Sequence, residues 1–351
     1  MKFKPVLLVA LLVGLLSTAG PGAMAQSAWR SVAVPYYTPP AYVQGLQFGW
    51  YAPRSREFAA QAQQLLQTTT AYCAGGSLPA ARASWRNTLL AWDQLGSVAI
   101  GPLIERRSAR RLDLGPVRPE LMARAIDAHP ASEADMERVG SPGKGFAALE
   151  ALLWPTAAAP GSPACDFAVQ VAADIGREAD ALVGAFDAAS RTEPDETETV
   201  AAMSEAVNQW IGGLDNFRSQ AFERPLRERE SRGSARLKFT RDASGASAAE
   251  RAVRWQTLRT LAVFEGGEAP APGAGLVPLE PYLRGKGLNP LADKLVAAVR
   301  RAGRGVDAAK GGSPASAQVA ARGLADLKTF VEAEVAPALD IRLGFTEADG
   351  D

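Results

Sequence analysis

Apolar residues recur along most of this chain with the spacing of one helix face. From Phe58 to Cys73 they fall at i, i+4, i+7 and i+8, and Gly75-Gly76 ends the run. Ser77 and Pro79 then begin a second segment, in which Trp85, Leu89 and Trp92 continue the stripe. The same periodicity predicts further helices at 121–128, 146–153, 171–186, 200–217, 288–299 and 320–335.

Two pairs of polar residues have the three-residue spacing of a helix capping box. Asp195 and Glu198 precede one apolar stripe, and Ser247 and Glu250 precede another that we expect to end at Gly266-Gly267. Strand-like alternation is short, with its main example at 32–37 before two prolines. The pattern therefore predicts an all-α protein.

A polar stretch divides the predicted helices into two sets of about four. It runs from Arg191 to Glu198 and contains Pro194. We interpret the sets as two helical bundles in series, at 30–190 and 195–351. The chain without its leader has about 325 residues, enough for two cores.

The N-terminus has the pattern of a secretory signal peptide. Lys2 and Lys4 precede an apolar run, and Ala23-Met24-Ala25 has the small-x-small form of a cleavage site. The run is too short to span a bilayer, and the first cysteine lies too far along for a lipoprotein. We therefore expect residues 1–25 to be removed before Gln26, with a periplasmic protein and no membrane span.

Charge excludes one class of partner. Lys plus Arg and Asp plus Glu number 38 each, and the leader takes two lysines with it, so the mature chain is slightly acidic. A protein that contacts many phosphates needs a basic surface, so we expect no nucleic-acid partner.

Cys73 and Cys165 are the two cysteines of the chain. An even count in an exported protein indicates a disulfide, whose long loop would contribute up to roughly 4–5 kcal/mol in the chain-entropy model. The alternative is a pair of free thiols for metal or redox chemistry, but neither cysteine lies in a CxxC motif or near a histidine.

Familiar catalytic patterns are missing. His129 is the single histidine, so an HExxH zinc helix cannot form, and its place before Pro130 indicates a loop at a helix end. Two charged stretches, 105–111 and the arginine-rich 224–241, are candidate anion sites. Because glutamates interleave the second, a solvated loop is the simpler interpretation.

Three motifs, in order along the chain, resemble those of the imelysin-like family. ASW at 83–85, Trp92 and GPL at 101–103 are similar to the opening "aW…aW…GP" of that family. GFAALEALLW at 145–154 resembles its GxHxxE segment, and LGFTEADGD at 343–351 resembles its C-terminal LGFxxxDGD. The resemblance implies an all-helical envelope protein of two bundle-like domains, often linked to iron or other metal acquisition, in a family whose founding member was described as a peptidase.

One position departs from the family motif. In GxHxxE the histidine and glutamate share a helix face within reach of one metal, but Ala147 stands here at the histidine position. The resemblance thus leaves Gly145, Ala147 and Glu150 as the candidate ligand site, with Glu150 as the one motif residue able to bind a divalent or iron cation. The other interpretation of Glu150 is a structural ion pair, with arginine the expected partner. Asp349 and Asp351 are a second acidic pair that could hold a hard cation.

Three functions remain open. The first is a non-catalytic binding or accessory protein of metal uptake, with an envelope partner. The second is a metal-dependent peptidase, which needs a metal, a water and a base that this histidine-poor chain supplies badly. The third is a structural envelope protein, which the absence of a cleft between the bundles would favour.

Overall fold

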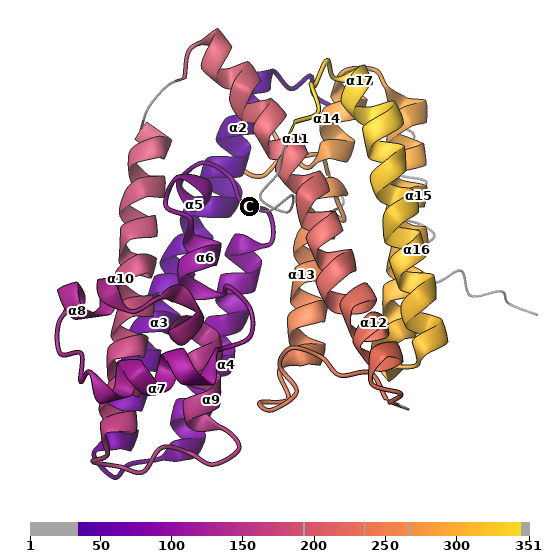
Figure 1. Ribbon diagram of the computed structural model, residues 1–351. Helices are drawn as coiled ribbons and strands as arrows, with labels where there is room; N and C mark the ends of the chain where they lie inside the picture. The colour runs from indigo at the N-terminus through magenta and orange to yellow at the C-terminus, as the bar shows by residue number, and fades with distance from the viewer. Residues whose placement is uncertain (1–33, 192–193, 235, 267, 345–351) are drawn as a thin grey trace, which may run out of the picture.

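Every regular element that the computed structural model describes is a helix, which confirms the all-α prediction. The structure describes residues 34–191, 194–234, 236–266 and 268–344, so the predicted leader and the residues 345–351 lie outside it. None of the helices within these ranges is long and apolar enough to cross a membrane. Figure 1 shows the helices gathered in two groups that stand side by side.

The first group is built around two long helices and their neighbours. α3 packs along α10 and α4, and α9 lies against α4 and α10. Their apolar stripes are buried as predicted, with Phe58, Trp85 and Leu89 fully covered. The four helices are α3 (Ala52–Cys73), α4 (Leu78–Gly96), α9 (Gly145–Leu153) and α10 (Pro163–Arg191).

A disulfide joins the end of α3 to the start of α10. Cys73 and Cys165 are bonded, with their Cα atoms 5.6 Å apart, so the predicted pairing is confirmed. The Tyr72 hydroxyl also donates a hydrogen bond of 2.6 Å to the carbonyl of Ala158 in the same corner. The disulfide and this side-chain hydrogen bond therefore stabilise the same end of the first group.

Short helices cover α10 in the segment between α4 and α9. They are α5 (Pro102–Glu105), α6 (Ser108–Leu112), α7 (Pro119–Asp127), α8 (Glu133–Arg138) and the 3-10 turn η2 (Ser141–Gly143). Arg106 and Arg111 from the charged stretch 105–111 both pair with the buried Glu178 of α10. Two of its arginines are thus used to fasten α5 and α6 to α10.

The second group follows the predicted boundary. α11 begins at a capping box in which Asp195 and Glu198 exchange hydrogen bonds, as predicted. Its helices are α11 (Glu196–Arg218), the π-helical η3 (Ser219–Glu223), α12 (Arg224–Ser231), α13 (Ser247–Ala262), α14 (Leu279–Gly285), α15 (Asn289–Ala308), the 3-10 turn η4 (Ala309–Gly311), α16 (Pro314–Phe330), η5 (Val331–Val335) and α17 (Ala336–Ala338). The division of the chain into two domains stays a prediction.

Three local predictions for this group are wrong. Ser247 is the first residue of α13, and its side chain caps no backbone N–H. Glu250 does not complete a capping box either, because it faces the protein interior and pairs with Arg254. The helix also ends at Ala262, short of Gly266, where Val263 turns to extended backbone. The segment 224–241 is likewise no plain loop, since α12 occupies its first half and Arg241 is buried.

The N-terminal segment crosses to the second group. Residues 34–38 form no strand, and α2 (Pro39–Leu46) begins at the two prolines, which fit the first turn of a helix. α2 continues into η1 (Gln47–Tyr51) and packs on α11, with the rings of Tyr42 and Tyr282 4.9 Å apart. The Tyr37 hydroxyl donates a hydrogen bond of 2.6 Å to the carbonyl of Pro270.

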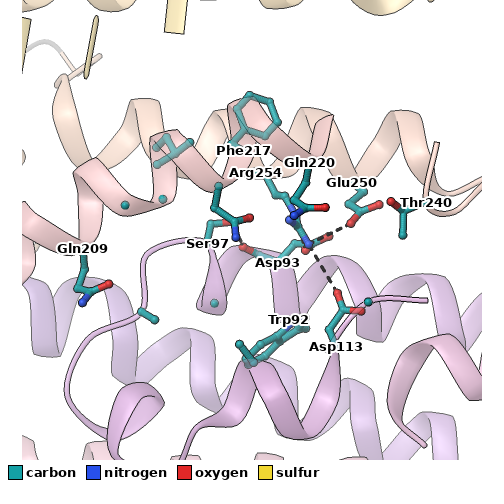
Figure 2. Close-up of a pocket in the computed structure, with 18 of the residues that line it drawn as sticks. Trp92, Asp93, Ser97, Asp113, Gln209, Phe217, Gln220, Thr240, Glu250 and Arg254 are labelled. Carbon is teal, nitrogen blue, oxygen red and sulfur yellow. Dashed lines mark hydrogen bonds and ion pairs between the residues drawn. The ribbon is translucent and has the colours of Figure 1, made fainter. Parts of the chain in front are cut away.

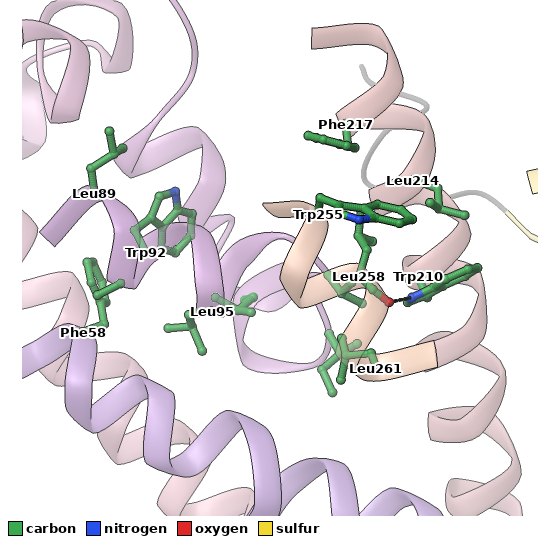
Figure 3. Close-up of a cluster of buried hydrophobic side chains, with 14 of the residues drawn as sticks. Phe58, Leu89, Trp92, Leu95, Trp210, Leu214, Phe217, Trp255, Leu258 and Leu261 are labelled. Carbon is green, nitrogen blue, oxygen red and sulfur yellow. Dashed lines mark hydrogen bonds between the residues drawn. The ribbon is translucent and has the colours of Figure 1, made fainter. Parts of the chain in front are cut away.

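One continuous apolar core links the two groups. Trp92 and Leu95 of α4 approach the layer of Trp210, Phe217 and Leu258 from α11 and α13 (Figure 3). The Trp210 indole donates a hydrogen bond of 2.8 Å to the carbonyl of Leu258. A Cβ on Gly213 would lie 2.4 Å from the Ser97 carbonyl oxygen, so only glycine permits this close approach of α11 to the end of α4.

Candidate functional site

The motif helix α9 begins at a position that requires glycine. Gly145 has φ +75°, and a Cβ there would lie 2.3 Å from the carbonyl oxygen of Leu112. The tight start brings α9 against α6 and turns its face toward the second group. Ala147 and Glu150 follow on this helix, one turn apart, and both are buried.

Both oxygens of Glu150 are bound by the loop between α12 and α13. The backbone N–H of Ser244 donates to Oε1 at 3.0 Å, and Nη1 of Arg241 donates to Oε2 at 3.4 Å. The arginine partner expected for Glu150 is therefore Arg241, which the sequence alone did not single out. Because Ala147 ends in a methyl group, the neighbouring position adds no ligand atom.

Arg241 lies between two carboxylates of the first group. Only 1% of the residue is exposed, and its second nitrogen donates to Asp113, which follows α6. Burial lowers the pKa of Arg241, but Asp113, Glu250 and Glu150 raise it more, so the pKa lies above its ordinary value. The guanidinium is a permanent cation in this pocket of acids.

Arg254 of α13 forms a second centre beside the first. Its Nε donates to Oδ1 of Asp93 at 2.8 Å, and its Nη2 lies 3.0 Å from Oε1 of Glu250 and 3.6 Å from Oδ2 of Asp113. Figure 2 shows this arginine among the three acids. Burial raises the pKa of Asp93 well above its ordinary range and raises that of Glu250, although Arg254 opposes both shifts.

A cavity of about 250 Å³ opens beside this second centre, between the two helix groups. Trp92 and Phe217 supply aromatic surface from opposite sides, and Asp93, Asp113 and Glu250 supply carboxylates (Figure 2). The exposed residues of its lining show where it reaches solvent: Ala109, Leu114, Asn216, Gln220 and Thr240. The cavity is thus partly polar, with carboxylate acceptor groups on its wall.

The residues around Glu150 do not fit a metal. A guanidinium already lies between Glu150 and Asp113, and a cation placed there would meet its positive charge. Within the described ranges, no three His, Cys, Asp or Glu side chains gather in a way that could hold a metal ion. The histidine of the chain, His129, is exposed in the turn after α7.

The structure thus unites Gly145, Ala147 and Glu150 on α9, while the acidic tail residues Asp349 and Asp351 lie outside the described ranges. Sequence reasoning missed two arginines and three acids that surround the site, of which Arg241 pairs with Glu150. They come from four separate segments, and their shared feature is charge at positions that pack inward: Asp93, Asp113, Arg241, Glu250 and Arg254. Asp93 carried one usable signal, because it lies next to Trp92 in a predicted buried stripe.

Comparison with known proteins gives a consistent result. The family model for imelysin, peptidase M75, matches residues 51–328. An imelysin-like protein from Psychrobacter arcticum 273-4 superposes with a TM-score of 0.71 at 20% identity, covering 90% of this chain and 100% of that one. A putative iron-regulated protein A precursor from Parabacteroides distasonis ATCC 8503 gives 0.67 at 14% identity, covering 84% and 93%. No protein with a curated description matches the chain.

Proposed function

Because the chain belongs to the imelysin family, we propose that it is a non-catalytic binding or accessory protein of the periplasm, connected with metal (iron) acquisition. The single observation that carries the non-catalytic role is the pairing of Glu150 with Arg241, beside Ala147. A metallopeptidase needs a bound metal, an activated water and a base. Here the motif carboxylate is neutralised by an internal cation instead.

Three further observations support the location and the connection with iron. The first 25 residues have the pattern of a cleaved leader, and the cysteines form a disulfide of the kind that exported proteins keep. One of the structural neighbours is named as an iron-regulated protein precursor. The cavity between the helix groups favours a binding role over a purely structural one, which would need no such space.

Hydrolysis of unfolded casein, with and without a chelator, tests the non-catalytic role. We expect no chelator-sensitive cleavage by protein purified from the periplasm. Cleavage that follows the bound metal and is lost in Glu150→Gln would contradict the proposal.

Growth of a strain that lacks the gene tests the connection with iron. We expect slower growth than the parent when iron is chelated, and equal growth when iron is plentiful. Rescue by the full chain, but not by a form that lacks residues 1–25, is expected for a periplasmic role. Equal growth of mutant and parent under chelation would remove the link to iron.

A further inference from the structure

The acids around Arg241 and Arg254 outnumber these two bases. Asp93, Asp113, Glu150 and Glu250 share two guanidinium groups, those of Arg241 and Arg254. Two more arginines lie near the cavity. Arg224 is engaged by Glu228 at 2.9 Å, and Arg251 acts on Glu250 only at longer range. When all four carboxyl groups are ionised, the cluster carries more negative charge than Arg241 and Arg254 balance.

One carboxylate oxygen in the cavity wall has no partner. Asp93 is 2% exposed and lines the cavity, and its Oδ1 is bound by Arg254. Its Oδ2 is buried and meets no hydrogen-bond donor among the described residues. A buried acceptor without a donor costs free energy, so a ligand that donates to it gains by binding.

Oδ2 of Asp113 is held less closely than Oδ1, which accepts from Arg241. It lies 3.6 Å from Arg254, beyond hydrogen-bond distance. Both deficits call for a hydrogen-bond donor that also carries positive charge. The faces of Trp92 and Phe217 on the same cavity suit methylene groups and attract cations.

We propose that this cavity binds a small organic cation, an alkyl ammonium compound, with Asp93 and its acidic neighbours receiving the ammonium group. The volume is below the roughly 300–1,000 Å³ of cavities that take drug-sized ligands, which limits the ligand to a short chain. Glu150 and Arg241 are not part of the cavity wall, although Asp113 belongs to the wall and also pairs with Arg241.

Calorimetric titration of the full mature protein with 1,4-diaminobutane tests the proposal, with 1,4-butanediol as the uncharged control. We expect saturable binding of the diamine and none of the diol. Asp93→Asn keeps the shape of the side chain and should weaken binding at least tenfold. Circular dichroism of each variant checks that it is folded.

A second variant keeps the test valid if Asp93→Asn does not fold. Gln220→Trp, at an exposed position of the lining, should block the cavity and abolish binding. Val319→Trp, on the exposed face of α16 and outside the cavity wall, is its matched control and should bind as the wild type does.

Three results would overturn the cation site: equal binding of diol and diamine, no binding of diamine, or diamine binding that Gln220→Trp leaves unchanged. Saturable binding of Zn²⁺ or Mg²⁺ that the same variants remove would also overturn it, in favour of a metal site. A variant that no longer binds the diamine but still restores growth under iron chelation would leave the accessory role standing. The two proposals can therefore fail separately.

Discussion

Arg241 reaches from the second helix group to a pair of carboxylates that the first group presents. Asp113 and Glu150 are brought together by the tight start of α9 at Gly145, and the arginine enters between them. Two acids can share a buried cation at low cost only while all three groups are present, because removal of one leaves a buried charge uncompensated. Changes to single side chains of this arrangement should therefore have measurable effects on stability and metal binding.

Replacement of Arg241 should destabilise the protein strongly. Arg241→Met keeps an unbranched apolar stem but leaves Asp113 and Glu150 without their buried cation, which typically costs about 3–5 kcal/mol. Urea unfolding measures the free energy. Arg227→Met removes an exposed arginine and should stay within about 0.5 kcal/mol of the wild type. Equal effects of the two changes would show that Arg241 is not a structural cation.

Histidine at position 147 should restore metal binding only when Arg241 is also removed. Ala147→His returns the i, i+3 pair with Glu150 to one helix face, but the guanidinium still neutralises the glutamate. We expect no stoichiometric binding of Zn²⁺ or Fe²⁺ by the wild type or the single variant. Ala147→His with Arg241→Met should bind one ion, measured by calorimetry on folded protein. Tight binding by the wild type would disprove the loss of the site.

Asp93 should make stability fall as pH rises. Burial raises its pKa in the folded protein above the ordinary 3.8, so between these values the folded state holds the proton more firmly than the unfolded state does. The contribution of Asp93 to the free energy of unfolding is complete below the pKa of the unfolded state. It is lost as the pH rises through the pKa of the folded state. The unfolding free energy of wild type minus that of Asp93→Asn should therefore decrease with pH, by up to about 1.4 kcal/mol per unit. A difference independent of pH would contradict this prediction.

At the scale of helices, periodicity was enough to predict most of the fold. Apolar stripes such as Phe58 to Cys73 are buried because a helix must cover its apolar face. Capping was less predictable, because the Asp195–Glu198 and Ser247–Glu250 spacings are the same and only the first pair faces solvent. α2 was missed because two prolines suggest a break, although both suit a first turn.

The two capping pairs provide a matched comparison. Asp195→Ala removes the side chain that accepts from the Glu198 N–H, and should cost about 1 kcal/mol. Ser247→Ala removes a hydroxyl that caps no helix, so stability should change by less than about 0.5 kcal/mol. Thermal unfolding of both variants compares them. A larger loss from the serine change would mean that α13 is capped by Ser247 in solution.

At the scale of the whole molecule, sequence could not show how the two groups meet. The charged contacts that join them link residues between about 90 and 160 positions apart, and no local pattern encodes such pairs. The arginine-rich segment suggested a solvated loop because its composition is mixed, yet Arg241 is almost fully buried between acids. The candidate site thus combines one predicted motif residue with partners that only the fold reveals.

The continuous core should make the two groups unfold together. Reduction of the Cys73–Cys165 disulfide, or its replacement by Cys73→Ser with Cys165→Ser, should lower stability by about 2–5 kcal/mol. Because the core spans both groups, differential scanning calorimetry should show one transition that shifts as a whole. Two separate transitions, with only one sensitive to reductant, would instead favour independent domains.

The crossing of α2 to the second group has a consequence for biosynthesis. A chain is made from its N-terminus, so Tyr37 and Tyr42 emerge long before Pro270 and Tyr282, against which they pack. Until those late residues arrive, the aromatic side chains of the first segment lack part of their cover and are open to chaperones. A truncated chain lacking α14 would keep them exposed permanently, which makes incomplete copies recognisable to proteases.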